Sequence, residues 1–494
     1  MLLQLHGLHP TFETNVSKEA WSIVQHKRLN LTEAEKNIYL LIHDKHISLQ
    51  NNIESGVEVY VSISKAGIKI SLDILDVVEK DANVCINTVI RHLNGIRNPG
   101  DSIWKGIYIV GPGTIAEIDR RPQLNLVQMD IKTSSGDPAT ILSNLIAEKV
   151  KDQKVAVRFS GGLESTSLLA ACSSMKNPED ILALTWFSKN DGGSSDVTES
   201  TRIARKLNIN HIIVPIDEKS LFCVDSNQRL PAYPTPALAF STFLKDLDNL
   251  AINHFNGSIP VILDGHGGDH IFLEYVDPPM LRDCMGKGFL KKLREYCNLN
   301  AEGYFQVVPA IFIGEKSPPR NILLKQHRNF FRIKNILAST DSMRRKRVRE
   351  ALDEISIPRS NQESKLLYPF LHPLMIGRSL SFNVSELFNS QTSRVAFRTS
   401  AYKKFGSDLF TRNSKGVVTG SFQKALQVHR DYLIPLVMNG FCASRRIIDL
   451  NLFKRTYDKS SHGVGGVNYE LMKIIMLEIL IHHTYRAINE RARK

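Results

Sequence analysis

Residues 155–165 read VAVRFSGGLES, and this stretch decides the fold. Its first five residues are mostly apolar and rich in valine, which predicts a short buried strand. Ser160, Gly161 and Gly162 then form a tight loop, and a helix is expected to begin near Ser165. Glycines let backbone N–H groups approach an anion, and the N-terminus of the helix adds the positive end of its dipole. The stretch therefore predicts a phosphate-binding loop, with a plain Gly-Gly turn as the alternative.

This loop differs from the loop that holds the β- and γ-phosphates in P-loop enzymes, because it has no Walker A lysine. The hydroxyls of Ser160 and Ser165 can instead donate hydrogen bonds to phosphate oxygens. We therefore expect the loop to hold phosphate groups, but not to serve γ-phosphate transfer.

A second glycine-rich loop, residues 263–272 with the sequence LDGHGGDHIF, also follows an apolar strand and also opens a helix. In a doubly wound parallel sheet the carboxyl ends of such strands face one crevice, so we expect the two loops to meet. Glu164 and Asp269 would then place two carboxylates beside one polyphosphate, which suits Mg²⁺. A helix N-cap is the alternative role for Asp269. Asp264 and Gly265 join the expected nucleotide-binding residues.

The polar stretch at residues 132–138 divides the chain into two parts. Before it, short runs of β-branched and aromatic residues, such as 57–63, predict a β-rich unit over residues 1–139. After it, strands alternate with helices, which predicts an α/β fold with parallel βαβ units in a doubly wound sheet. The expected elements include a helix at about 138–151 and strands at 155–159, 181–187, 212–216 and 261–263. We expect a nucleotide-binding core at residues 140–280 and a mainly helical part at residues 281–494.

The composition is that of an ordinary globular protein, with 42% hydrophobic and 23% charged residues among 494. A formal net charge of +13 favours anionic partners. The densest basic run, residues 344–349, is interpreted as an exposed basic helix face, with a nucleic-acid or localisation patch as the alternative. We expect no nucleic-acid partner.

The six cysteines are scattered, with no CxxC pair and no histidine at zinc-ligand spacing, so we expect reduced thiols. The first 30 residues lack the apolar segment of a signal peptide, and no run of 18 apolar residues occurs. These features predict a cytoplasmic protein without membrane insertion.

The two glycine loops occur in an order that resembles the synthetase domain of asparagine synthetases and β-lactam synthetases, and the resemblance extends over nearly all of the chain from residue 140. It implies a pyrophosphate-binding (PP-loop) fold with ATP and Mg²⁺ as cofactors. The implied reaction transfers AMP from ATP to a substrate carboxylate, and an amine then displaces the AMP. The resemblance also places Leu184 and Thr185 near the adenine.

Two further residues receive roles from this resemblance. Residues 412–417 are similar to the place where the family has a lysine that neutralises charge on the reacting phosphate and acyl oxygens, which implies this role for Lys415. A surface lysine is the alternative. His266 stands where β-lactam synthetases have a tyrosine base, and its ordinary pKa near 6.5 suits proton removal. A hydrogen bond to phosphate, or a structural role, remains an open alternative for His266.

The N-terminal unit departs from the glutamine-dependent members of the family. Those enzymes need a cysteine exposed after removal of Met1, and here Leu2 follows Met1 while the first cysteine is Cys85. We therefore interpret residues 1–139 as a degenerate glutaminase-like unit, a silent relic of an Ntn-amidohydrolase domain.

Several residues of the synthetase part differ from those of asparagine synthetases and indicate which branch of the family the chain resembles. His270, Lys365 and His372 replace acidic residues of asparagine synthetases, and residues 265–272 together with 404–410 most resemble the lasso-peptide macrolactam synthetases, or lasso cyclases. Those bacterial ligases close the isopeptide ring of antimicrobial peptides. The resemblance implies adenylation of an Asp or Glu side chain in a precursor peptide, attack by the N-terminal amine of that peptide, and a leader peptidase as partner.

Two alternatives remain. One is an ammonia-dependent asparagine synthetase or a β-lactam-type synthetase, which His270 and Lys365 disfavour. The other is an inactive ATP-binding scaffold of a peptide-processing complex, which the replacement of the usual aspartate by Glu164 favours. A glutamate still carries a carboxylate that can reach Mg²⁺, so we expect an active enzyme.

Overall fold

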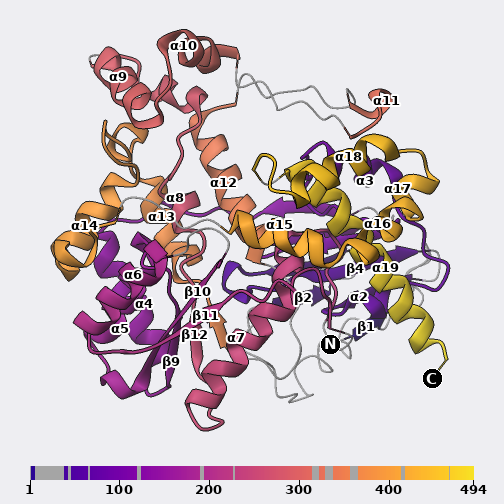
Figure 1. The fold of residues 1–494 in the computed structure, drawn as a ribbon, viewed down its shortest axis with the longest axis horizontal. Coiled ribbons are helices and arrows are strands. Elements are labelled where there is room, and N and C mark those ends of the chain that lie inside the picture. Colours follow the sequence, from indigo (N-terminus) through magenta and orange to yellow (C-terminus); the bar gives the residue numbers. More distant parts are fainter. Residues whose placement is uncertain are drawn as a thin grey trace.

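The computed structural model describes most of the chain (Figure 1). The described residues are 2–5, 38–42, 46–64, 67–119, 124–189, 194–225, 229–286, 288–313, 322–328, 338–355, 365–412, 418–466 and 468–493. They form three β-sheets and a set of helices that gather mainly in the second half of the chain.

Two four-stranded antiparallel sheets make up the N-terminal unit. The first has the order β1 (Leu2–Leu5), β5 (Gly67–Ser71), β4 (Val59–Ser64) and β6 (Ile107–Val110). The second has the order β2 (Ile38–Ile42), β3 (His46–Asn51), β7 (Thr114–Asp119) and β8 (Leu124–Gln128). Side chains of β4, such as Val59 and Val61, share one buried cluster with Leu49 of β3 and Ile118 of β7. The two sheets therefore pack face to face, and the predicted β-rich unit is present.

The third sheet is parallel throughout. Its order is β11 (Asn210–Pro215), β10 (Ile181–Phe187), β9 (Val155–Arg158), β12 (Val261–Leu263) and β13 (Lys365–Leu367). Four of these strands were predicted from their apolar runs. The sequence did not indicate β13, because its three residues begin with a lysine and are only half-buried, so they form no apolar run.

Helices cover both faces of this sheet (Figure 1). They are α4 (Pro138–Val150), α5 (Leu163–Ser173), α6 (Ser194–Lys206) and α7 (Ser241–His254). Val155 and Val157 of β9 lie in the same cluster as residues of α4, α5 and α6. The alternate residue Ala156 lies in a second cluster with Ala251 of α7 and Phe255. The sheet is thus doubly wound, as predicted, because successive side chains of a strand point to opposite faces.

The strand order reverses beside β9. The chain adds β10 and β11 on one side of β9 and then returns to place β12 and β13 on the other side. In open α/β sheets, ligands bind outside the carboxyl ends of the strands at such a reversal. Both predicted glycine loops follow the two strands that meet there.

The helix α4 begins where the polar stretch ends. Asp137 is its N-cap, and the Asp137 carboxylate accepts a hydrogen bond of 3.0 Å from the N–H of Thr140. Pro138 at the first helical position loses no hydrogen bond, because that N–H has no intrahelical partner. The helix therefore starts within one residue of its predicted position.

The remaining helices build the second half of the chain. They are α8 (Gly268–Ile271), α9 (Phe289–Asn300), α10 (Tyr304–Ile313), α11 (Lys325–Arg328), α12 (Thr340–Ile355), α13 (Pro373–Leu380), α14 (Val395–Phe405), α15 (Thr419–Val428), α16 (Arg430–Met438), α17 (Phe441–Ser444), α18 (Leu450–Ser461) and α19 (Tyr469–Arg491). α2 (Ile74–Val77) and α3 (Ile86–Leu93) belong to the N-terminal unit. Residues of α3 and of α19 lie in one buried cluster, so the C-terminal helices pack on the N-terminal unit.

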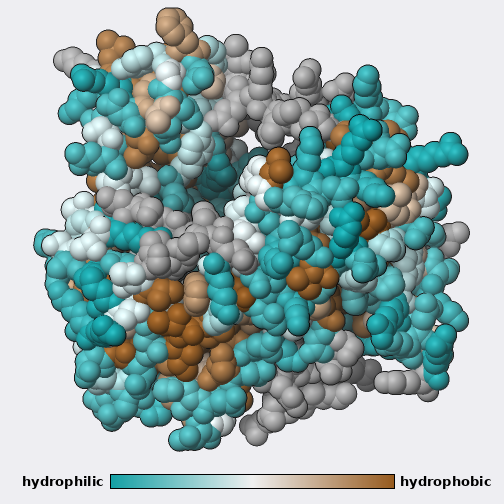
Figure 2. Space-filling model, viewed as in Figure 1, coloured by the Kyte–Doolittle hydropathy of each residue, from teal (hydrophilic) through white to brown (hydrophobic). Residues whose placement is uncertain are grey.

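The helices α9 and α10 project at one end of the molecule, where Figure 2 shows apolar residues at the surface. Apart from Gln306, the residues of α10 are mainly apolar, and the helix buries Val307 and Ile311 while Phe305 stays 97% exposed and Phe312 53% exposed. No helix in the described part of the chain combines the length and the low charge that crossing a bilayer requires.

The basic run at residues 344–349 lies on α12 and differs from its interpretation as an exposed face. Arg344 is buried, and its guanidinium donates to the carbonyl oxygens of Ser379 and Phe382 at the end of α13. Arg347 pairs with Asp277, and Arg349 donates to Thr114 Oγ1 over 2.7 Å. The interpretation was wrong for these three arginines. Although they lie close together in the sequence, each contacts a different partner in the folded protein.

Candidate functional site

The two glycine loops meet at the reversal of strand order. A Cβ on Gly265 would lie 3.0 Å from Glu164 Cβ and 3.2 Å from the backbone nitrogen of Ser165. A Cβ on Gly268 would lie 2.4 Å from Glu164 Cγ. A contact of 2.4 Å does not occur at a real Cβ, and contacts of 3.0–3.2 Å are tighter than most, so glycine at both positions lets the second loop approach the start of α5. The expectation that the loops meet is confirmed.

The first loop has the conformation expected of an anion cradle. Gly161 has φ +72°, in the left-handed region that favours glycine. The Ser165 hydroxyl accepts a hydrogen bond of 3.2 Å from the Ser160 N–H, and the two serine hydroxyls lie 3.2 Å apart. Both hydroxyls therefore face the loop, beside the N-terminus of α5.

A segment from the C-terminal part of the chain lies beside this loop. Arg412 forms an ion pair with Asp196 of α6, and its guanidinium lies 3.5 Å from the carbonyl oxygen of Ser160. Thr411 donates a hydrogen bond of 2.7 Å to Glu199 of α6. The segment that precedes Lys415 thus lies beside the loop, whereas Lys415 itself falls outside the described residues.

Glu164 is buried, and its Oε1 forms an ion pair with the guanidinium of Arg394. Arg394 is also buried, has φ +57°, and places a second nitrogen 3.4 Å from Glu274. Burial lowers the pKa of Arg394, but the carboxylates of Glu164 and Glu274 outweigh burial and raise this pKa above its ordinary value. One oxygen of the predicted metal ligand Glu164 is therefore engaged by a cation.

Asp264 holds the base of the second loop. Its Oδ1 accepts a hydrogen bond of 2.9 Å from the His266 N–H, and its Oδ2 lies 3.2 Å from the guanidinium of Arg158. Arg158 is buried in β9 and pairs also with Asp248 over 2.9 Å. Burial alone lowers the pKa of Arg158, but Asp248 and Asp264 raise it. Asp264 thus connects the second loop to Arg158 of β9.

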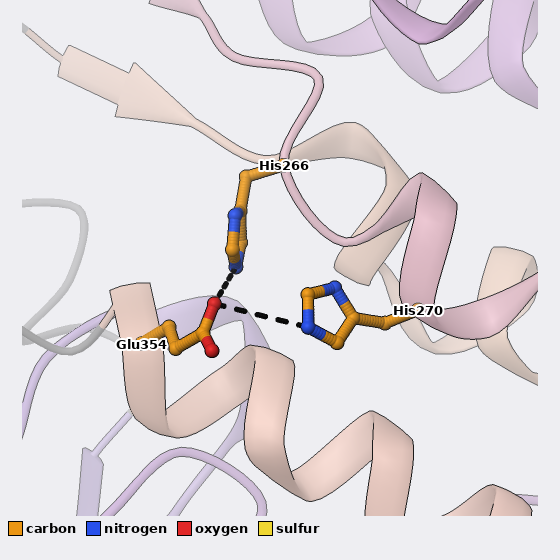
Figure 3. A group of neighbouring side chains, drawn as sticks. All are labelled: His266, His270 and Glu354. Atoms are coloured by element: carbon orange, nitrogen blue, oxygen red, sulfur yellow. Dashed lines mark ion pairs between the residues drawn. The ribbon is translucent and has the colours of Figure 1, made fainter. Parts of the chain in front are cut away.

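His266, His270 and Glu354 of α12 form a cluster beside this loop (Figure 3). The Oε2 atom of Glu354 lies 3.4 Å from His266 Nε2 and 3.8 Å from His270 Nε2. His270 Nδ1 lies 3.0 Å from Asp269 Oδ1. Burial lowers the pKa of His270, but the hydrogen bond and charge of Asp269, together with Glu354, raise it above its ordinary value.

The two residues expected near the adenine lie inside the parallel sheet. Leu184 and Thr185 of β10 are both fully buried. The Thr185 hydroxyl donates over 2.6 Å to the carbonyl oxygen of Phe159, the residue before the first loop, and lies 2.8 Å from His211 Nε2. Trp186 and Phe187, which follow them, are only half-buried. This end of β10 therefore lies next to the first loop.

Residues 142–482 match the asparagine synthase family, which is more than half of the chain. The chain belongs to the asparagine synthase family. Proteins of this family use ATP and are carbon–nitrogen ligases. The chain is also similar to the Microcin J25-processing protein McjC of Escherichia coli, with 23% identity over 419 residues, covering 80% of this chain and 75% of that protein.

Sequence reasoning missed two charged residues of this family member's site, Arg394 and Glu354. Neither belongs to a motif, and each reaches the glycine loops from a helix or turn far along the chain. The sequence did indicate His372, which replaces an aspartate of the family. In the structure His372 is the N-cap of α13 and pairs with Glu54 over 3.1 Å. No local pattern predicts such long-range partners.

Proposed function

We propose that the chain is a lasso peptide cyclase, an AMP-forming ligase that closes a macrolactam ring in a precursor peptide. It activates an Asp or Glu side chain of the precursor with ATP. The N-terminal amine of the same peptide then attacks the activated carbonyl carbon, an isopeptide bond forms, and AMP leaves after pyrophosphate. A bacterial cytoplasmic setting and a leader peptidase that exposes the amine belong to this proposal.

The single observation that carries this proposal is the meeting of the two glycine loops, in the order that this family has, in a chain similar to McjC. The loops bring a phosphate cradle and a set of titratable side chains to one crevice. McjC processes a peptide, microcin J25, by its name. A peptide substrate is therefore favoured over the small amines and acids of the asparagine and β-lactam synthetases.

The residues of the first loop fit the phosphates of ATP. Gly161 and Gly162 carry no side chains that would block an anion, and Ser160 and Ser165 offer hydroxyl groups next to a helix N-terminus. Leu184, Thr185, Asp264 and Gly265 are assigned to the adenine side and floor of the same crevice. We assign the PP-loop type of fold on this basis.

Glu164 and Asp269 fit Mg²⁺ in their chemistry, because each supplies carboxylate oxygens beside the phosphate cradle. Because Glu164 Oε1 pairs with Arg394, the other oxygen of this carboxylate is the one that would bind a metal. When bound, Mg²⁺ would neutralise phosphate charge. Asp269 also holds the His270 ring through Oδ1.

We assign His266 the removal of a proton from the attacking amine. Its Nε2 faces two acceptors, Glu354 Oε2 at 3.4 Å and the carbonyl oxygen of Ala351 at 3.3 Å. The neutral ring therefore carries its hydrogen on Nε2, and the lone pair that can accept a proton is on Nδ1. Glu354 would orient the ring.

We assign Lys415 the stabilisation of the negative charge that grows on the reacting oxygens. We interpret residues 1–139 as a silent relic of a glutaminase domain. Arg412 beside Ser160 supports the first assignment, because it places the segment that leads to Lys415 at the phosphate cradle. The second is supported by the two packed antiparallel sheets of this unit and by the position of its first cysteine, Cys85.

The test is incubation of the purified chain with ATP, Mg²⁺ and a leaderless precursor peptide. We expect one AMP and one pyrophosphate for each peptide that loses the mass of one water. Lys415→Ala is expected to bind ATP nearly normally while its cyclisation rate falls by a factor on the order of 10²–10³, the usual cost of deleting one charge-stabilising group.

ADP as the stoichiometric product would overturn the family chemistry. AMP production with asparagine or a small lactam as product, and none with the peptide, would instead favour the alternative synthetases. Normal cyclisation by Lys415→Ala would move the charge-stabilising role to a neighbour such as Arg412.

A further inference from the structure

His266, His270 and Glu354 converge on one point from two elements. His266 and His270 are four residues apart, in the second glycine loop and the short helix α8 that follows it, while Glu354 lies on α12. Figure 3 shows one carboxylate oxygen of Glu354 facing both imidazole rings. The side chains of His266 and His270 are 27% and 19% exposed, and that of Glu354 is 48% exposed, so the point is open to small ions.

The spacing of these atoms matches a tetrahedral metal site. One ligand atom from each residue lies within 4.8 Å of the other two, and Glu354 Oε2 lies 3.4 Å and 3.8 Å from the two Nε2 atoms. Bonds of about 2.1 Å in a tetrahedron separate ligand atoms by roughly 3.4 Å. Two imidazoles and one carboxylate, with the fourth position open, form a ligand set that Zn²⁺ accepts.

Asp269 supplies the second observation. Its Oδ1 lies 3.0 Å from His270 Nδ1, so it fixes the ring with Nε2 directed towards Glu354. A carboxylate on the other ring nitrogen is the usual support of a metal-bound histidine. The nearby cation Arg347 is paired with Asp277, which reduces its repulsion of a metal ion.

We propose that His266, His270 and Glu354 bind one divalent transition-metal ion of the zinc class. Imidazole nitrogens favour Zn²⁺, Co²⁺, Ni²⁺ and Cu²⁺ over Mg²⁺, which prefers oxygen ligands. This ion is therefore distinct from the Mg²⁺ that accompanies ATP.

The metal site does not depend on the proposed function. The two roles of His266 nevertheless exclude each other, because a ring that binds metal through Nε2 carries its hydrogen on Nδ1 and cannot accept a proton there. Metal occupancy is thus expected to slow amine attack while leaving nucleotide binding in place.

The experiment titrates the full chain, stripped of metal and free of nucleotide, with Co²⁺ alone at pH 7.5. We expect one equivalent to bind with the visible absorption of four-coordinate Co²⁺, and we expect Zn²⁺ but not millimolar Mg²⁺ to displace it. His270→Gln and Glu354→Gln should each weaken the affinity by at least about tenfold, the scale of losses at altered metal sites.

His483→Ala is the matched control. The rings of His482 and His483 lie 5.4 Å apart, close to the 5.3 Å between His266 and His270. Burial and the charges of His482 and Arg486 lower the pKa of His483 to about 4, and the positive charge of Arg486 repels a metal ion. Unchanged affinity in His270→Gln and Glu354→Gln, loss in His483→Ala, or binding without the four-coordinate spectrum would each overturn the proposal. Melting curves of every variant exclude unfolding as the cause.

Discussion

Glu164 carries the negative charge of the first glycine loop, and the folded chain pairs it with Arg394 from 230 residues away. Both side chains are buried. Burying two charges costs solvation free energy, which their mutual attraction repays only when both partners are present. The pair therefore ties the phosphate loop to the turn before α14 and makes each residue depend on the other.

Arg394→Met is expected to lower the free energy of unfolding by about 3–5 kcal/mol, because it leaves the buried Glu164 carboxylate without its cation. Guanidinium denaturation measures this loss. The double variant Arg394→Met with Glu164→Gln should recover a large part of it, since no buried charge then remains unpaired. A double variant as unstable as Arg394→Met alone would contradict this account.

Short elements in the C-terminal part depend on distant side chains in the same way. The four-residue helix α17 follows Gly440, and Glu478 of α19 accepts hydrogen bonds from the N–H groups of Phe441 and Cys442, at 2.8 Å and 2.6 Å. A Cβ on Gly440 would lie 2.3 Å from this carboxylate. A buried glutamate on a long helix thus caps a helix too short to be stable by itself.

Glu478→Ala is expected to lower the free energy of unfolding by about 2 kcal/mol or more, because two buried N–H groups lose their acceptor. Glu490→Ala on the same helix is the matched control. Glu490 pairs with Arg486 at the surface, and such pairs contribute about 0–1 kcal/mol. Equal losses in the two variants, measured by urea denaturation, would show that the cap is unimportant.

On the scale of the whole molecule, α12 and α13 join the N-terminal unit to the synthetase part. Arg349 of α12 donates to Thr114 Oγ1 of β7 over 2.7 Å, while Glu54 accepts from His372, the N-cap of α13, over 3.1 Å. Lys149 of α4 also lies 3.1 Å from Glu54. The N-terminal unit therefore supports the helix that carries Glu354 and the helix that follows the edge strand β13.

The hydrogen bond from His372 lowers the pKa of Glu54, and despite partial burial, which raises it, the pKa falls from 4.5 to about 2. A carboxyl group whose pKa is depressed by folding stabilises the fold above its unfolded pKa and loses that effect as pH falls through the folded pKa. Glu54→Gln should thus lower the melting temperature at pH 6 and much less near pH 2. An equal difference at both pH values, measured by circular dichroism, would contradict the pairing.

Local sequence signals predicted four of the five strands of the parallel sheet and the position of the two glycine loops. Apolar runs of three to seven residues, each followed by a turn, are local signals, and they predicted β9, β10, β11 and β12, while the polar stretch before Pro138 indicated the start of a helix. The two glycine loops could also be predicted from the sequence, because a close approach of two backbones requires glycine at defined positions.

Only the tertiary structure decided which charges face these loops. Arg394, Glu354 and Glu54 reach their partners from elements far apart in the chain, and an ion pair leaves no period or motif in either segment. The basic run on α12 makes the same point, because neighbours in sequence turn to different partners when the helix is packed. Charge pairing depends on which surfaces meet, and that is settled by packing rather than by local sequence.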